Sequence, residues 1–175
     1  MQPRTQPLRD EHRALLPELA MLRIAADAIG TPAAADHVAR SHRLLVRHLL
    51  PHIAAEEAVL YPAIDRLAGH DLTATLRRDH DEIRRRTAQI EAAPHHTPAR
   101  RDSELRSALY GLDAIVRLHL TSEEELYYPL LDEHLDEAAA VTIVAAMQRV
   151  KHDSYQATAL DARDENATTP RVDPA

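Results

Sequence analysis

Two segments of this sequence repeat one another and place ionisable side chains where a helix should be apolar. The segments are HLLPHIAAEEAVLYP, residues 48–62, and RLHLTSEEELYYP, residues 117–129. At an offset of 67 residues, five identities recur: His52/His119, Glu56/Glu123, Glu57/Glu124, Tyr61/Tyr128 and Pro62/Pro129. Both segments have the spacing of an amphipathic helix, and in each the histidine and the first glutamate fall within the apolar face. The repeat therefore constrains both the fold and the chemistry.

The periodicity of the apolar residues predicts an all-α protein. We expect helices at about residues 8–29, 33–67, 71–92 and 102–133, and a shorter fifth helix at about 137–160. Short connections between the first four predict an up-down-up-down four-helix bundle. Leu8-Arg9 and His12 recur as Leu76-Arg77 and His80, so we expect the bundle to be a duplicated helical hairpin.

The ends of the chain are predicted to lie outside the helical domain. Residues 1–7 contain two prolines and are expected to be a flexible lead-in. Residues 8–160 are expected to form one helical bundle, with its four-helix core at 8–133 and the extra helix at about 137–160. The polar segment 161–175 is predicted to be a disordered tail.

Composition agrees with helices and narrows the class of protein. The 175 residues include three Gly and neither Phe nor Trp, so the core must consist of Leu, Ile, Val, Ala and Tyr. The formal net charge of −7 argues against a nucleic-acid partner. No apolar run approaches the roughly 20 residues of a membrane span, so we expect a cytoplasmic protein without a membrane partner. The lack of Cys excludes disulfides, iron–sulfur clusters and thiolate ligands.

Each repeated segment contains a His-x-x-x-Glu pair whose two side chains converge. Residues four apart lie about 40° apart around a helix and one turn apart along it. A lone carboxylate in an apolar seam is costly to bury unless a cation accompanies it. A seam histidine also occupies corresponding positions on the two preceding helices. We therefore predict six metal ligands: His12, His52, Glu56, His80, His119 and Glu123.

The alternative for any one of these histidines is a core imidazole satisfied by hydrogen bonds. Two equivalent pairs, each preceded by a seam histidine, favour metal binding instead. His48 lies one turn before His52 and is expected to be a partner of the ligands rather than a ligand. The other histidines are predicted to lie at the surface: His37, His42, His70, His95, His96, His134 and His152.

Four imidazoles and two carboxylates exceed the ligand set of one zinc ion. They suit two first-row ions, with a pair of histidines on each and the two glutamates positioned to bridge. Nitrogen and oxygen ligands without thiolate favour iron or manganese. Ferritin-like di-iron bundles use Glu-x-x-His, a motif that does not occur in this sequence.

The order His12, His52-x-x-x-Glu56, His80, His119-x-x-x-Glu123 resembles hemerythrin-like (HHE cation-binding) domains. The surrounding segments, DEHRALLPEL among them, are also similar, and the resemblance covers about residues 8–133. It implies a non-haem di-iron centre, oxo- or hydroxo-bridged when oxidised, with manganese less favoured. The resemblance also implies that dioxygen, nitric oxide or hydrogen peroxide binds there. By position, the four histidines would be terminal ligands and the two glutamates bridges.

The sequence departs from the oxygen-carrying hemerythrins on two helices. Arg84 stands where those proteins have a fifth histidine, and the fourth helix carries His-x-x-x-Glu in place of His-x-x-x-x-Asp. One ligand fewer implies open coordination positions. Tyr127, one turn after Glu123, is predicted to face the metals as a catalytic phenol, with core packing as the alternative. Pro62 and Pro129 are predicted to kink or end their helices.

Three functions are compatible with these features. The first is an enzyme that decomposes hydrogen peroxide or oxidises a small substrate, which the open coordination and Tyr127 favour. The second is a module that binds or senses dioxygen, nitric oxide or iron without turnover. The third is a purely structural metal site. The sequence identifies no protein partner.

Overall fold

The computed structural model describes residues 2–168, and every regular element in that range is helical. The α-helices are α1 (Gln6–Ala28), α2 (Ala34–Leu44), α3 (Leu50–Ala55), α4 (Tyr61–Ala68), α5 (Ala74–Ala92), α6 (Pro98–Ser122), α7 (Tyr128–His134) and α8 (Glu137–Thr168). Three π-helical turns, η1 (Leu45–Leu49), η2 (Glu56–Leu60) and η4 (Glu123–Tyr127), and one 3₁₀ turn, η3 (Ala93–His95), complete the order. The π turns join their neighbours without a break, so five helical runs result. The all-α prediction is confirmed.

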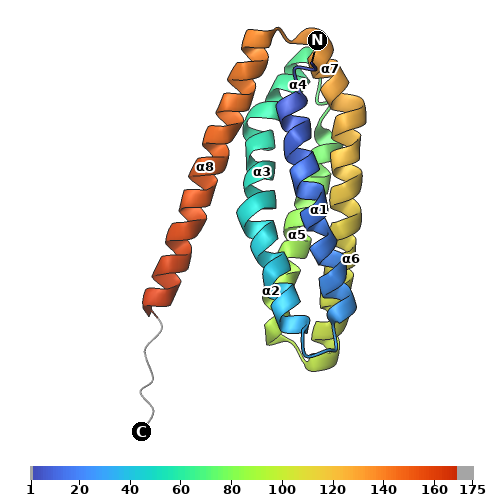
Figure 1. Ribbon diagram of the computed structural model, residues 1–175, viewed down its shortest axis with the longest axis vertical. Coiled ribbons are helices and arrows are strands. Elements are labelled where there is room, and N and C mark those ends of the chain that lie inside the picture. Colours follow the sequence, from blue (N-terminus) through green and yellow to red (C-terminus); the bar gives the residue numbers. More distant parts are fainter. Residues whose placement is uncertain (1, 169–175) are drawn as a thin grey trace.

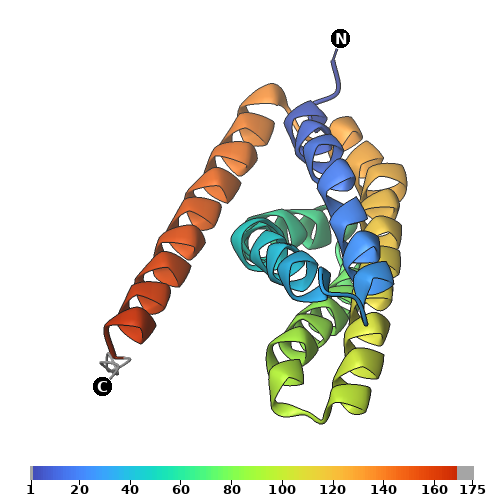
Figure 2. The ribbon, with the colours of Figure 1, turned by 60° about the horizontal axis from the view of Figure 1, so that its bottom comes forward.

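Four of the runs lie side by side and the fifth flanks them (Figure 1). α1 packs against α2 and α6, and α5 packs against α6. α8 packs mainly against α3 and diverges from the other helices toward its C-terminal end (Figures 1 and 2). The last helix therefore has a neighbour on only one side of the molecule.

The interior consists of two apolar clusters with a polar layer between them. The larger cluster includes Leu15, Leu19, Leu49, Ile83 and Val116, all at most 9% exposed. The smaller includes Leu8, Leu60, Ile64, Leu76 and Leu131, all at most 2% exposed. Burial of each such side chain contributes about 2 kcal/mol, which offsets the cost of burying polar groups between the clusters.

A proline follows each of the three π turns. Pro51, Pro62 and Pro129 each stand two residues after a π turn ends. A proline inside a helix lacks an N–H donor and its ring clashes with the carbonyl four residues earlier, which lies within the turn. Widening the turn to i→i+5 bonds removes the clash without ending the helix. The predicted disturbance at Pro62 and Pro129 is therefore a local π turn within a continuous helix.

Thr5, directly before α1, is held by Asp132, while the flexible lead-in expected over residues 1–7 stays a prediction. The Thr5 backbone N–H donates to Asp132 Oδ1 at 2.8 Å and the Thr5 hydroxyl donates to Asp132 Oδ2 at 2.9 Å. The equivalent pair of residues has the same arrangement, with Thr73 donating twice to Asp65 at 2.9 Å. These contacts start α1 at Gln6 rather than at residue 8.

The last helix is longer than the sequence analysis predicted. α8 ends at Thr168 rather than at residue 160, so residues 161–168 are helical and only 169–175 of the predicted tail lie outside the described residues. The extension contains two alanines, one arginine and one glutamate, all of which have good helix propensity. Among residues 2–168, no helix combines the length and apolar character that crossing a membrane requires.

Candidate metal centre

Six polar side chains from four helical runs form the layer between the apolar clusters. They are His12 of α1, His52 of α3, Glu56 at the start of η2, His80 of α5, His119 of α6 and Glu123 at the start of η4. Their exposed fractions range from 0% to 5%. The fold therefore brings together all six residues that the sequence analysis proposed as ligands.

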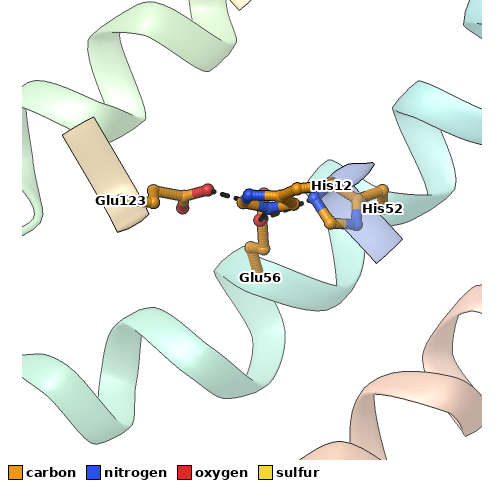
Figure 3. A group of neighbouring side chains, drawn as sticks. All are labelled: His12, His52, Glu56 and Glu123. Carbon is orange, nitrogen blue, oxygen red and sulfur yellow. Dashed lines mark ion pairs between the residues drawn. The ribbon is translucent and has the colours of Figure 1, made fainter. Parts of the chain in front are cut away.

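The layer divides into two overlapping groups of potential ligand atoms. The first group is His12, His52, Glu56 and Glu123 (Figure 3), and the second is Glu56, His80 and His119, with the atoms of each group within 4.8 Å of one another. Glu56 belongs to both groups. Its Oε1 lies 2.8 Å from His52 Nε2 and its Oε2 lies 3.3 Å from His80 Nε2. This one carboxylate presents an oxygen to each group, which is the geometry of a bridging ligand.

Glu123 also faces histidines from both halves of the repeat. Its Oε2 lies 3.5 Å from His12 Nε2 and its Oε1 lies 3.7 Å from His119 Nε2. The two separations are longer than those of Glu56, and only the first falls within a ligand group. Glu56 is therefore the better placed of the two carboxylates to bridge.

Several of these buried atoms have no hydrogen-bond partner among the described residues. They are His52 Nε2, both carboxylate oxygens of Glu56 and Glu123 Oε2. Although His52 Nε2 and Glu56 Oε1 are 2.8 Å apart, the pair lacks hydrogen-bond geometry. A buried polar atom without a partner costs about 1–3 kcal/mol. Lone pairs that converge in each group are the donors that a first-row cation requires, so the residues fit metal ions.

The electrostatics of the layer point to the same conclusion. Burial alone would raise the pKa of Glu56, but His52, with His12 and His80, outweighs burial and lowers that pKa well below its usual value. Burial raises the pKa of Glu123 well above its usual value, and the negative charge of Glu56 adds to the rise. Without a cation, the pKa values of the two buried carboxyl groups are therefore shifted in opposite directions. Bound cations would allow both to ionise.

The four histidines each have a carboxylate beside the ring nitrogen that points away from the layer. The Nδ1 atoms of His12, His52, His80 and His119 lie 3.1, 3.6, 2.9 and 3.3 Å from Glu124, Glu11, Glu57 and Asp79. Such carboxylates fix the tautomer and orientation of a metal-binding imidazole and raise its basicity. The sequence analysis did not assign these four partners. The identity of Glu57 and Glu124 within the repeat was the signal that could have found two of them.

Two tyrosines that the sequence analysis did not assign to the site reach into the layer. The Tyr61 hydroxyl donates to Glu123 Oε1 at 2.9 Å and lies 3.1 Å from His80 Nε2. The Tyr128 hydroxyl lies 2.9 Å from His12 Nε2. Both tyrosines are fully buried, and burial, followed by the adjacent Glu56 and Glu123 carboxylates, raises the pKa of each phenol. The layer therefore contains two phenol groups that keep their protons.

Tyr127, the residue predicted to face the metals, points elsewhere. Its hydroxyl donates to the Leu72 carbonyl at 3.4 Å. The cause is the π turn that begins at Glu123, in which the Tyr128 N–H donates to the Glu123 carbonyl. In a turn with an i→i+5 hydrogen bond, residues i and i+5 lie on the same face of the helix, one turn apart. In an α-helix the same two residues would differ by about 140° around the axis. The turn therefore brings Tyr128, instead of Tyr127, onto the face of Glu123, and η2 does the same for Tyr61 and Glu56.

An arginine lies over the ring of each of these two tyrosines. The guanidinium carbons of Arg9 and Arg77 lie 5.3 Å from the ring centroids of Tyr128 and Tyr61 respectively. Arg77 Nη2 in turn lies 3.4 Å from Asp65 Oδ2, and Arg9 makes the equivalent pair with an aspartate of the other half. The cation–π contacts orient the phenol groups toward the layer.

A cavity of about 510 Å³ lies between α1, α3 and α8 and reaches the layer at one residue, His52. His52 is 5% exposed, the largest exposed fraction among the six. His48 and His152 also line this cavity and are exposed. His48 belongs to neither of the two ligand groups, and its predicted role as a partner of the ligands stays a prediction.

A helical bundle that buries four imidazoles and two carboxylates in one polar layer defines a candidate non-haem metal protein. The family described as hemerythrin HHE cation binding domain matches residues 5–152 of the chain. The chain therefore belongs to the hemerythrin family of HHE cation-binding domains, as the order of its histidines and glutamates indicated. No curated protein and no solved structure matches the chain.

Proposed function

We propose that this protein binds two iron ions in an up-down-up-down four-helix bundle and decomposes hydrogen peroxide. The observation that carries the proposal is the position of Glu56, whose two oxygens face two separate groups of histidine nitrogens. In the proposed reaction, two hydrogen peroxide molecules give two water molecules and one dioxygen molecule. One peroxide is oxidised and the other reduced, so no external reductant is needed.

The residues of the layer divide between the two ions. His12 and His52 would hold one ion, and His80 and His119 would hold the other. Imidazole-rich donor sets favour iron over manganese, which prefers carboxylate and water ligands. Iron bound there would supply the electron transfer, and the chain itself supplies ligand geometry, burial and protons.

The two tyrosine hydroxyls are the proton donors closest to the proposed ligands. The Tyr61 hydroxyl lies within 3.2 Å of both His80 Nε2 and His119 Nε2. A phenol at this place can donate a hydrogen bond to a peroxide oxygen and so assist its departure as water. We assign this role to Tyr61 and, in the other half, to Tyr128. We do not assign this role to Tyr127, because its hydroxyl faces the Leu72 carbonyl. The catalytic role that the sequence analysis gave to Tyr127 stays a prediction.

Reversible binding of dioxygen or nitric oxide is the second candidate function. The observation that favours it is the nearly complete burial of the layer between two apolar clusters. Such surroundings admit a diatomic molecule more readily than an organic substrate. In this case the phenol groups would act only as hydrogen-bond donors to the bound molecule.

Oxygen evolution distinguishes the two functions. Protein reconstituted with iron is mixed with hydrogen peroxide in an oxygen electrode, beside a Glu56→Ala variant that received the same iron. We expect the wild type to evolve oxygen through many turnovers, well above the variant and above free iron. Equal rates in all three samples, with reversible spectral changes on adding dioxygen or nitric oxide, would establish the binding function instead.

A further inference from the structure

The chain contains twenty arginines and a single lysine, Lys151, on α8. The Lys151 ammonium pairs with Glu11 Oε2, and its side chain is 19% exposed. Gln148, one turn earlier on α8, donates to Glu11 Oε1 at 2.5 Å. Two side chains of the flanking helix therefore hold both oxygens of one carboxylate on α1.

Glu11 links α8 to the candidate metal centre. Its Oε2 lies 3.6 Å from His52 Nδ1, and the opposite nitrogen of that ring, Nε2, belongs to the first ligand group. A chain of charged groups thus runs from Lys151 through Glu11 to His52. Both Glu11 and His52 line the cavity of about 510 Å³ beside α8. That cavity gives the Glu11 carboxylate space to turn away if its partners on α8 are removed.

The second half of the repeat lacks an equivalent arrangement. The counterpart of Glu11 is Asp79, which lies 3.3 Å from His119 Nδ1. Among the described residues, no lysine or arginine pairs with Asp79. At the second ligand group the supported carboxylate is Glu57, to which Arg84 donates at 2.9 and 2.6 Å and which lies 2.9 Å from His80 Nδ1. The two ligand groups therefore differ in the residues that hold their carboxylates. Within residues 2–168, only the first group has a carboxylate held by side chains of α8.

We infer that Lys151 is a positioning residue that, through Glu11, orients the His52 ring and strengthens metal binding by the first ligand group. The inference rests on the proposed function, because it requires a metal ion in that group. An ammonium is a compact point charge, which allows it to take one carboxylate oxygen while Gln148 takes the other. Fixing the carboxylate fixes the tautomer and direction of the imidazole that faces it.

Metal release to a chelator tests this inference. In Lys151→Met, which keeps the apolar stem, we expect one of the two ions to leave about 10-fold faster and the other to leave at the wild-type rate. Arg84→Met should accelerate the other ion, and the double variant should release both quickly. Lys151→Arg should restore most of the retention. Arg149→Met is the matched control, because it removes one exposed positive charge from the same helix.

A double-mutant cycle separates positioning from simple docking of α8. If Lys151 acts through Glu11, then Glu11→Gln alone should reproduce the faster release, and adding Lys151→Met should change it little. Additive effects, or release from Lys151→Met at the rate of Arg149→Met, would overturn the inference. If Lys151→Met does not fold, Glu11→Gln must still release one ion faster. A wild type that binds no iron would instead refute the proposed function.

Discussion

Tyr61 stacks on His80 with ring centroids 5.2 Å apart and an interplanar angle of 14°, and its hydroxyl lies 3.1 Å from His80 Nε2. The two residues come from different halves of the repeat. Tyr128 and His12 have the reciprocal relationship, with ring centroids 5.3 Å apart and a hydroxyl-to-nitrogen distance of 2.9 Å. Each half of the chain thus supplies a phenol to a histidine of the other half.

Replacing Tyr61 by Phe should slow peroxide decomposition without removing iron. The change keeps the stacked ring but deletes the hydroxyl, so a proton donor is lost while the ligands stay in place. We expect oxygen evolution to fall by about tenfold or more. The oxygen electrode measures the rate, and elemental analysis checks that the iron content is unchanged.

Tyr127→Phe is the matched control, since its hydroxyl faces the Leu72 carbonyl. We expect this variant to retain the wild-type rate. A strong loss in Tyr127→Phe together with full activity in Tyr61→Phe would show that the sequence-based assignment of the phenol was right and the assignment from the structure wrong.

Replacing Glu56 by Ala should remove both iron ions, because this carboxylate belongs to both ligand groups. Metal content after reconstitution should fall from about two ions per chain toward zero. His37→Ala, a substitution outside the layer, should leave the metal content unchanged. Retention of one tightly bound ion in Glu56→Ala would show that the carboxylate serves a single ion.

Removing the metal should lower the thermal stability of the protein. An ion that binds only the folded state at 100 times its Kd adds about 2.7 kcal/mol. For a chain of this size we therefore expect chelation to lower the Tm by roughly 5–10 °C. Circular dichroism at 222 nm is the measurement. The Glu56→Ala variant should show no such response, and an equal response there would mean that the chelator acts elsewhere.

The metal-free protein should lose stability as the pH rises above 6.5. Burial opposes the charged form of His52, but Glu56, Glu11 and Glu123 outweigh burial and raise the pKa of His52 from 6.5 to about 10. A raised folded pKa stabilises the protein fully below pH 6.5, and this contribution disappears as the pH approaches 10. The raised pKa of Glu123 acts in the same direction, because the unfolded state releases that proton more readily.

The measurement is the Tm of the metal-free protein at pH values from 6.5 to 10. His52→Gln should flatten the dependence, whereas His37→Ala should retain it. The iron-loaded protein should show a smaller decline, because a metal ligand is already deprotonated. A metal-free protein whose Tm rises over this range would contradict the charge state assigned to His52.

Local pattern was sufficient to predict much of this molecule. Apolar periodicity identified five helical runs, and the polar residues that interrupted it, His52 and Glu56 among them, were the residues that the fold gathers into one layer. The reason is that the spacing of side chains around a helix is a property of neighbouring residues. A buried carboxylate is also conspicuous in sequence because its burial is costly.

Tertiary structure alone decided which phenol and which carboxylates face the layer. In the π turn at Glu123, the Tyr128 N–H donates to the Glu123 carbonyl, and Tyr128 instead of Tyr127 faces the layer. Such an i→i+5 hydrogen bond is absent from an α-helix, so α-helical spacing does not predict which tyrosine faces the layer. The pairing of Lys151 with Glu11 joins residues at opposite ends of the chain. Contacts of that kind arise only when packing brings distant helices together, so helical periodicity, which relates neighbouring residues, contains no signal for them.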